Sequence, residues 1–468
     1  MTVTLRCTRS ALAVRAAFRY NRGRAARRGR AAAAKGSGVS ARQRIREIRE
    51  GFAPAFWVAN TSELFERLAY YGVQAVLAIY LHETLRFSDA QTGDLIGYFG
   101  GVVWFLPILG GALADAIGFR RALSLAYLVL SAGYFLLGSL GAPWMAPVAH
   151  AMPLERLVLL VLLVPALGPA IVKPCVVGTT ARASKENVRS IGYSIYYTLV
   201  NIGGAAGPLV AAEVHKHWGV PSVFRVAALA VFLMVFAVIF FFKEPAGESD
   251  RRTENFGAAF RNFWSIVSNV RFLTFLVIFS GFWIVFWQQY IALPLYLHAY
   301  VNSHANVERI LATDALTVIF LQVPITYLTR WIPAFPAMAL GVLISGAAWL
   351  ILAAHASVSA AIATLVVVAL GETIQTARYY EYISRLAPPG QQGTYMGFAF
   401  LPIAIGFVIG GAMGGRLVHY FGEIAHQPQR VWLACAGIGF ATTVLLLTYN
   451  AIVRPTAGAA PAAPAASE

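Results

Sequence analysis

The sequence predicts an all-α polytopic membrane protein whose twelve transmembrane helices form two six-helix bundles. First, 58 % of the 468 residues are hydrophobic and only 12 % are charged, whereas about 25 % of a soluble domain is charged. Second, the hydrophobic residues gather in twelve long runs, and a helix needs about 20 apolar residues to cross the hydrocarbon core. Third, the widest charged interruption divides these runs six and six, as in transporters built from repeated bundles.

The twelve expected spans are separated by charged or turn-forming segments. In chain order they are 53–81, 91–114, 121–141, 153–181, 190–213, 221–243, 271–299, 307–330, 335–355, 357–386, 394–419 and 430–453. We therefore expect an N-terminal bundle at 51–243, a cytoplasmic central loop at 244–270 and a C-terminal bundle at 271–453.

The two ends of the chain differ in composition from the spans. Residues 1–50 hold 14 of the 37 Lys and Arg and two of the 21 acids, which accounts for +12 of the net charge of +16. This segment is too poor in large apolar residues to build a core, so we expect a disordered basic cytoplasmic extension. The low-complexity stretch 454–468 is expected to be a disordered tail. Because the positive charge lies in the extension, it does not indicate a nucleic-acid partner.

The basic residues of the loops predict that both termini are cytoplasmic, because cytoplasmic loops carry an excess of Lys and Arg. With this orientation the inside loops carry Arg120, Arg121, Arg182, Lys185, Arg189, Lys243, Arg251, Arg252, Arg261 and Arg385. The outside loops carry mainly Arg86, Lys216, Arg309 and Arg430. The expected location is the plasma (inner) membrane.

A few ionisable residues fall inside the expected spans, where a charge is costly unless it faces a partner or a water-filled cavity. The strongest candidates are Glu63, Glu66, Arg67, Lys173, Glu372, Arg378 and Glu381, and the weaker ones are Asp314 and Arg416. These residues are therefore candidates for function.

In the first span, Glu63, Glu66, Arg67 and Tyr70 share one face of a helix that turns about 100° per residue. Glu63 and Arg67 could form an i, i+4 ion pair that only stabilises the helix. The stripe could instead face a cavity to which Lys173 adds a further cation. Buried carboxylates beside cations can exchange protons near neutral pH, which suits proton carriage.

The segment "ELFERLAYYG" resembles the E-x-x-E-R-x-x-Y-Y-G signature on the first helix of the proton-coupled oligopeptide transporters of the major facilitator superfamily. "GGALADAIGFRR" is similar to the superfamily loop motif after the second helix, "VKPCVVG" to the family's fourth-helix segment and "YSIYYTLVNIGGAAGPL" to its fifth-helix segment. "GETIQTARYYEYISRLAP" resembles the tenth helix. The resemblance implies the major facilitator fold.

The resemblance also implies symport of di- or tripeptides with protons by alternating access, with protons as the coupling ion and no other cofactor. Arg67 and Lys173 would hold the peptide carboxylate and Glu372 its amino terminus, and Glu63 and Glu66 would take part with Arg67 in proton coupling. The further implied residues are Tyr70, Tyr71 and Asn201 in the pocket, and Asp115, Arg120 and Arg121 in a cytoplasmic gate.

The sequence departs from the family pattern in span 7, in span 10 and in the segment 244–270, which has no room for the two extra helices common between the halves of bacterial members. Trp287, followed by Gln288, stands where the family has an acid that couples protonation to gate opening, and Trp104 stands where relatives often have a pocket tyrosine. The added Arg378 could pair with Glu381 or reshape the substrate pocket. We count Trp104, Trp287, Gln288 and Arg378 among the substrate-binding candidates.

These departures leave alternative functions open: transport of another small zwitterionic or anionic solute, or a non-transporting peptide sensor. The expected partners are small peptides, protons and the lipid bilayer, and the chain is expected to act as a monomer. No phosphate-binding loop, metal-ligand cluster or nucleophile motif occurs in the sequence, so neither an enzyme nor a metal site is expected.

Overall fold

The computed structural model describes residues 50–108, 117–244, 264, 266–388 and 392–453. These residues fall into two units. The smaller unit contains residues 50–52 together with 185–188, where the 3-10 helix η3 (Glu186–Val188) lies and Lys185 N donates to Gly51 O at 2.9 Å. All that follows concerns the larger unit, which begins at Ala53 and resumes at Arg189.

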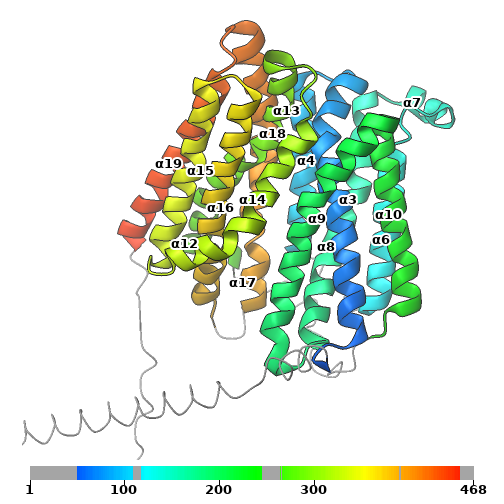
Figure 1. Cartoon of the computed structure of the whole chain (residues 1–468), viewed down its shortest axis with the longest axis vertical. Coiled ribbons are helices and arrows are strands. Elements are labelled where there is room, and N and C mark those ends of the chain that lie inside the picture. Colours follow the sequence, from blue (N-terminus) through cyan, green and yellow to red (C-terminus); the bar gives the residue numbers. More distant parts are fainter. Residues whose placement is uncertain (1–49, 109–116, 245–263, 265, 389–391, 454–468) are drawn as a thin grey trace, which may run out of the picture. The chain divides into compact units, whose positions relative to one another are not determined.

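The first half of the larger unit consists of helices on one side of the fold (Figure 1). They are α3 (Pro54–Ile79), η1 (Tyr80–Thr84), α4 (Asp89–Phe105), α6 (Phe119–Leu137), η2 (Pro143–Met145), α7 (Ala146–Ala151), α8 (Leu154–Arg182), α9 (Arg189–Trp218) and α10 (Val220–Phe241). Within this half, α3 packs against α9 and α10, and α6 packs against α8 and α10.

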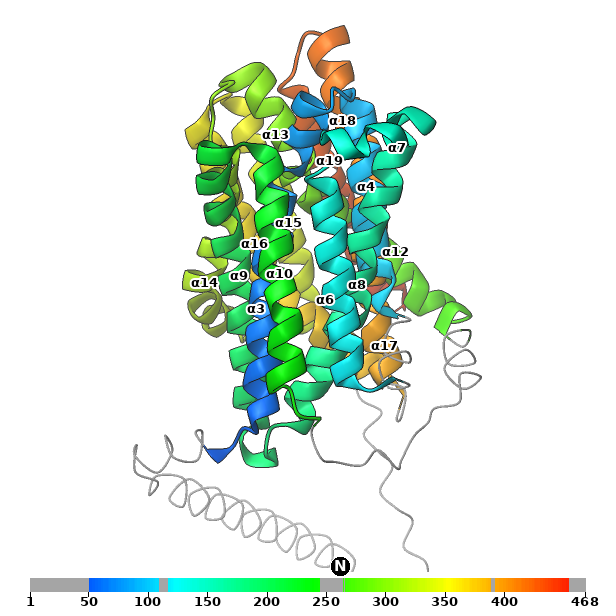
Figure 2. The same cartoon turned by 90° about the vertical axis from the view of Figure 1, so that its right-hand side faces the viewer.

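The second half consists of helices that run beside the first (Figure 2). They are α12 (Val270–Phe286), η4 (Trp287–Gln289), α13 (Ala292–Tyr296), η5 (Leu297–Val301), α14 (Val307–Thr329), α15 (Ala334–Ala354), α16 (Val358–Leu386), α17 (Gln392–Phe398), α18 (Leu401–His419), η6 (Tyr420–Ile424) and α19 (Arg430–Val453). Here α15 packs against α16 and α19, and α12 against α18.

The expected all-α membrane fold is confirmed. Ten helical segments of the described residues are long and apolar enough to cross a membrane. The remaining two expected spans correspond to α3, which carries three charged residues, and to α4, whose helix has 17 residues. Each of the twelve expected spans therefore coincides with a helix, although the end of the second span, 109–114, lies outside the described residues.

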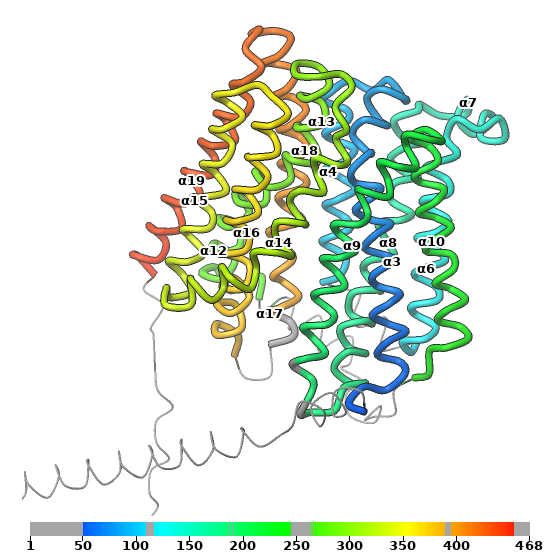
Figure 3. Tube along the Cα trace, viewed as in Figure 1, coloured from blue at the N-terminus to red at the C-terminus, as the bar shows by residue number. Residues whose placement is uncertain are grey.

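Two of the expected spans contain breaks that the periodicity did not predict (Figure 3). The seventh span changes from α12 to a 3-10 turn at Trp287 and resumes as α13. Pro294 has no N–H to donate to the carbonyl four residues earlier, which favours a break there. The eleventh span breaks between α17 and α18, where Phe400 lies just before Pro402. Both breaks put aromatic side chains beside the candidate site.

Glycines allow the two halves to approach closely where α4 meets α18. A Cβ atom added at Gly93 would collide with the carbonyl oxygen of Gly411, and one added at Gly415 would collide with that of Asp89. Gly410 instead faces Ile284 of α12, so different glycines of α18 serve contacts on its two sides. Gly411 and Gly415 are four residues apart, and small residues at this spacing let helices pack closely in membranes.

Candidate functional site

Three charged side chains of α3 form one buried group, which we call the α3 cluster: Glu63, Glu66 and Arg67. Arg67 Nη2 donates to Glu66 Oε1 at 2.6 Å, and its Nε contacts Glu66 Oε2 and lies 3.5 Å from Glu63 Oε1. None of the three side chains is more than 1 % exposed. The Glu63–Arg67 pair is expected whether the polar stripe of α3 only stabilises the helix or faces a cavity, so it does not separate the two interpretations. However, neither oxygen of Glu63 accepts a hydrogen bond among the described residues, which is costly for a buried carboxylate unless a proton or ligand arrives.

Lys173 of α8 lies beside the α3 cluster. Its Nζ stands over the ring of Trp104 at 4.0 Å from the centroid and over the ring of Phe400 at 5.5 Å. Trp104 Nε1 in turn donates to the hydroxyl of Tyr70 at 3.3 Å. The ammonium is close enough to all three members of the α3 cluster to interact with them electrostatically. The structure therefore brings Arg67, Tyr70, Trp104 and Lys173 together.

The second half presents aromatic rings toward Trp104, on which the Lys173 ammonium rests. Trp287 is buried, and its ring lies 6.3 Å from that of Trp104. It stacks on Phe407 at 3.9 Å and lies 5.8 Å from Trp283. The Trp287 indole is therefore enclosed by the rings of Trp104, Trp283 and Phe407.

Gln288 and Asp314 each have a buried side-chain oxygen without a hydrogen-bond partner among the described residues. Gln288 Nε2 donates to the carbonyls of Ile284 at 2.8 Å and Gly410 at 3.0 Å, so this side chain ties α12 to α18. Asp314 of α14 is buried and its Oδ1 has no hydrogen-bond partner among the described residues. Asp314, which the sequence ranked low, is therefore a candidate for a polar role in addition to Gln288.

Glu372 lines a cavity of about 170 Å³ between α9, α14 and α16. The lining residues are Tyr197, Val318, Gln322, Glu372, Thr373, Thr376, Ala377 and Tyr380. Asn201 is not among these lining residues, and its Nδ2 donates to the carbonyl of Tyr197, one helical turn earlier, at 2.9 Å. A carboxylate surrounded by hydroxyl and amide groups is suited to binding an ammonium group.

Tyr71 connects the charges of the two halves. Its ring packs 6.5 Å from the ring of Tyr290 in the second half. It interacts electrostatically with Arg67 in its own helix and with Glu372 and Asp314 across the fold. Arg67 of the first half and the carboxylates of Asp314 and Glu372 in the second half therefore all lie near one phenol.

Arg378 makes contacts that fit the pairing alternative. Its Nη1 donates to Glu381 Oε2 at 2.8 Å and its Nη2 to the carbonyl of Thr329 at 3.2 Å. Glu381 also accepts from Arg385 at 2.5 Å. The guanidinium thus joins α16 to the end of α14, and Arg378 is not among the residues that line the Glu372 cavity.

The expected gate residues can be traced only in part. Asp115 lies outside the described residues. Arg120 is exposed, and its side chain donates to the carbonyl of Ile239. Glu244 accepts from the backbone N–H groups of Phe119 at 2.7 Å and Arg120 at 3.2 Å, so a carboxylate caps the start of α6. Arg121 is exposed.

Four ion pairs between the halves were not predicted. They are Asp94 with Arg416 at 2.7 Å, His215 with Glu308 at 2.5 Å, Glu83 with His298 at 2.5 Å, and Glu213 with Arg309. All four lie at the end of the fold where α3, α9 and α18 finish and α4 and α14 begin, which we call the ion-paired end. Of the residues in these four pairs, only Arg416 drew attention in the sequence, because an arginine within an apolar span needs a partner.

Comparison with known proteins decides the family. A profile of the Major Facilitator Superfamily matches residues 61–312 and 289–467. The chain belongs to the Major Facilitator Superfamily. It is accordingly an integral membrane protein and a secondary transporter by family, not an enzyme.

The similar proteins include peptide permeases and a multidrug resistance protein. Dipeptide and tripeptide permease A of Salmonella typhi is 28 % identical over 184 residues, which are 39 % of this chain and 34 % of the permease. The chain thus matches about a third of the permease's length. Multidrug resistance protein MdtH of Salmonella arizonae is 22 % identical over 395 residues, 81 % of this chain and 89 % of MdtH. The resemblance to oligopeptide transporters is confirmed as a distant one.

A solved structure supports the fold. The crystal structure of a peptide transporter POT in complex with alafosfalin superposes with a TM-score of 0.70 at 19 % sequence identity, covering 85 % of this chain and 94 % of that one. At this identity the likeness establishes the fold alone. The superfamily arrangement of two six-helix bundles, predicted from the spans, is thereby confirmed.

Proposed function

We propose that this protein takes up di- and tripeptides together with protons, as a monomer, by alternating access. One arrangement carries the proposal: Tyr71, whose ring lies 6.5 Å from that of Tyr290 in the second half, is close enough to interact with both Arg67 and Glu372. A short peptide is a zwitterion, and a cation on one side with a carboxylate on the other matches its two charged ends. Lys173 adds a second cation near the same place.

The α3 cluster supplies a means of coupling peptide to protons. Arg67 is held by Glu66 and Glu63, so it cannot bind a carboxylate fully while both acids keep it. A proton on Glu63 or Glu66 weakens the ion pair between that glutamate and Arg67, and the Arg67 guanidinium then becomes available to the peptide carboxylate. Substrate and proton therefore favour the same state, which is the requirement for symport.

The pocket favours small substrates. Trp104 and Trp287 are both buried and close to each other, and the described cavity beside Glu372 measures about 170 Å³. Dipeptides with small side chains are therefore the first substrates to test.

The ion pairs suggest which side of the site is closed. They join the halves at the ion-paired end, whereas the Glu372 cavity is lined by the early part of α9 and the later parts of α14 and α16. We take the ion-paired end to face outward, with both termini in the cytoplasm and the protein in the plasma (inner) membrane. Asp115, Arg120 and Arg121 would then belong to the inner gate.

Trp287 favours a second candidate function. The second half lacks an acid at this position, so a proton-independent carrier of another small zwitterion, or a sensor that binds without transport, would fit the same charges. MdtH, a multidrug resistance protein by name, also matches most of the chain. The test must therefore separate binding, flux and coupling.

The decisive experiment is uptake of labelled dialanine into liposomes that contain the purified full chain, with and without an inward proton gradient. Wild-type protein should take up dialanine, and the gradient should increase the rate. The variant Glu372→Gln should lose at least tenfold in uptake, because a hydrogen bond to a charged group contributes about 1.5–3 kcal/mol.

Glu381→Gln is the matched control, because Glu381 lies on the same helix but pairs with arginines outside the cavity. It should keep its uptake within twofold. Uptake that ignores the gradient would overturn coupling, binding without uptake would favour the sensor, and equal loss in both variants would remove Glu372 from the site.

A further inference from the structure

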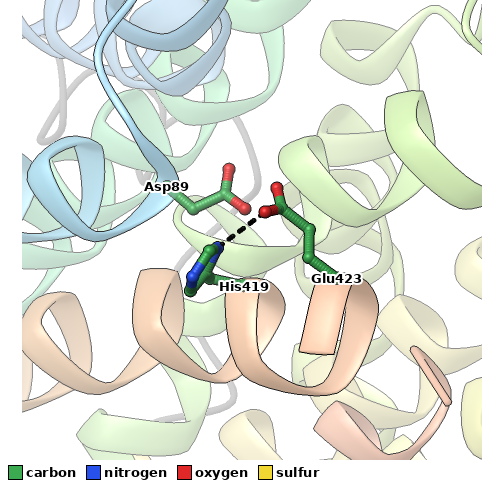
Figure 4. Close-up of side chains that lie close together, drawn as sticks. All are labelled: Asp89, His419 and Glu423. Carbon is green, nitrogen blue, oxygen red and sulfur yellow. Dashed lines mark ion pairs between the residues drawn. The ribbon is translucent and has the colours of Figure 1, made fainter. Parts of the chain in front are cut away.

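Three ionisable side chains meet at the ion-paired end and take no part in the proposed transport (Figure 4). They are Asp89 at the start of α4, His419 at the end of α18 and Glu423 in η6. One nitrogen or oxygen of each lies within 4.8 Å of the others, and His419 Nδ1 is 3.0 Å from Glu423 Oε2. The three residues come from both halves of the fold.

The group places two carboxylates against one imidazole. Asp89 is buried and close enough to Glu423 for the two to repel each other. Like charges held together favour uptake of compensating positive charge, either a proton or a bound cation. His82 supplies only part of this positive charge. Its Nδ1 lies 3.4 Å from Asp89 Oδ1, but it is shared with the carbonyl of Phe87, which is closer at 3.0 Å.

The backbone fixes this approach. Gly415, one turn before His419, has no side chain, and a Cβ atom there would collide with the carbonyl of Asp89. Asp89 is therefore held against α18 by main-chain packing. His419 and Glu423 are exposed, so they can rotate toward a ligand that arrives from solvent.

We propose that Asp89, His419 and Glu423 bind a divalent transition-metal cation, best matched by Zn²⁺, that links α4 to α18 and η6. Imidazole nitrogen and carboxylate oxygen are zinc ligands, at about 2.0–2.2 Å from the metal. The imidazole disfavours Mg²⁺ and Ca²⁺, which take oxygen ligands. Three protein ligands leave a fourth position for water, and His82 can orient Asp89 from behind.

The sequence could not predict this site. His419 and Glu423 stand one helical turn apart, but Asp89 lies in the other half of the chain and becomes a neighbour only because α4 packs on α18. The same two helices are joined by Asp94 and Arg416. A bound metal would thus strengthen an existing connection between the halves.

The test is a zinc titration of the purified full chain, without an affinity tag, by isothermal calorimetry. We expect saturable binding of one Zn²⁺. Glu423→Gln, His419→Ala and Asp89→Asn should each weaken it at least about tenfold, since even outer-shell changes cost about 10–100-fold in metal affinity. Glu423 is exposed, so Glu423→Gln keeps the test decisive even if another variant fails to fold.

His217→Ala is the matched control. His217 also forms an i, i+4 pair with a glutamate, Glu213, but the third group there is the cation Arg309. Zinc binding should be unchanged in this variant. No saturable binding by the wild type, or binding that survives Asp89→Asn, would overturn a site shared by both halves.

The consequence for transport rests on the proposed function and is measured separately. Zinc outside the liposomes should slow dialanine uptake by the wild type several-fold and leave Glu423→Gln unaffected, because the link opposes opening of the ion-paired end. Zinc binding without this effect would refute the link to opening and leave the metal site standing.

Discussion

The two halves of the transporter treat charge at the centre of the fold in opposite ways. The first half buries two glutamates and an arginine on α3 and sets Lys173 beside them. The second half meets them with the rings of Trp283, Trp287 and Phe407. The second half also has two ionisable groups near the centre, but they belong to other helices than these rings: Asp314 is on α14 and Glu372 is on α16.

This difference separates two tasks: exchanging protons or binding an anion, and setting the size of the cavity. A charged cluster in a medium of low dielectric can exchange protons or bind an anion, because both relieve the cost of buried charge. Aromatic rings do neither, but they fix the size of the cavity and can hold a cation over their faces. Under the proposed function, the α3 cluster would supply the coupling to protons, whereas the aromatic rings of the second half would limit the size of the substrate.

The largest expected effect comes from removing the central cation of the first half. Arg67→Ala leaves Glu63 and Glu66 buried without it, and breaking a buried ion pair from one side costs about 3–5 kcal/mol. We expect a clearly lower unfolding temperature and uptake at background. Thermal unfolding of the purified protein and dialanine uptake measure the two effects.

The double variant Glu66→Gln with Arg67→Gln is the control for charge. It replaces the closest pair by two neutral amides, so it should recover stability relative to Arg67→Ala while uptake stays lost. An Arg67→Ala protein as stable as the wild type would mean that the cluster already faces water.

A smaller effect is expected where the ionic and aromatic surfaces meet, at Trp104. The change Trp104→Phe removes the hydrogen bond to Tyr70 and weakens the face on which Lys173 rests. Such cation–π contacts contribute about 0.5–2 kcal/mol. The KM for dialanine should therefore rise about three- to tenfold while the maximal rate changes little.

Trp349→Phe serves as the comparison, because Trp349 stacks on Trp432 within the second half at 4.8 Å. It should leave KM unchanged. If Trp104→Phe also leaves KM unchanged, Lys173 does not depend on the indole for its position.

The sequence predicted those parts of the fold and site that depend on local pattern. Twelve apolar runs were enough to place the helices, and the spacing within α3 put Glu63, Glu66, Arg67 and Tyr70 on one face. The motif positions also brought Lys173 to the same place. The helices and the polar face of α3 could be predicted because their pattern lies within one helix. Lys173 could be predicted because the family motif that contains it also implies which helix it faces.

The features that the sequence missed arise from pairs of helices far apart in the chain. Asp94 meets Arg416, and Asp89 meets His419, only because α4 packs on α18 through Gly93 and Gly411. Breaks within spans were missed as well, because hydropathy does not register whether an apolar run stays helical. Phe400, which shares Lys173 with Trp104, belongs to such a break.

The smallest expected effect distinguishes the two interpretations of Arg378. This side chain is 18 % exposed and pairs with Glu381 outside the cavity. Pairs near the surface contribute about 0–1 kcal/mol, so Arg378→Ala should change the free energy of unfolding by no more than that and uptake by less than twofold. Arg385→Ala, which removes the other arginine bound to Glu381, should behave alike. A KM raised tenfold in Arg378→Ala alone, at unchanged stability, would instead put Arg378 in the substrate pocket and give the second half a cation of its own.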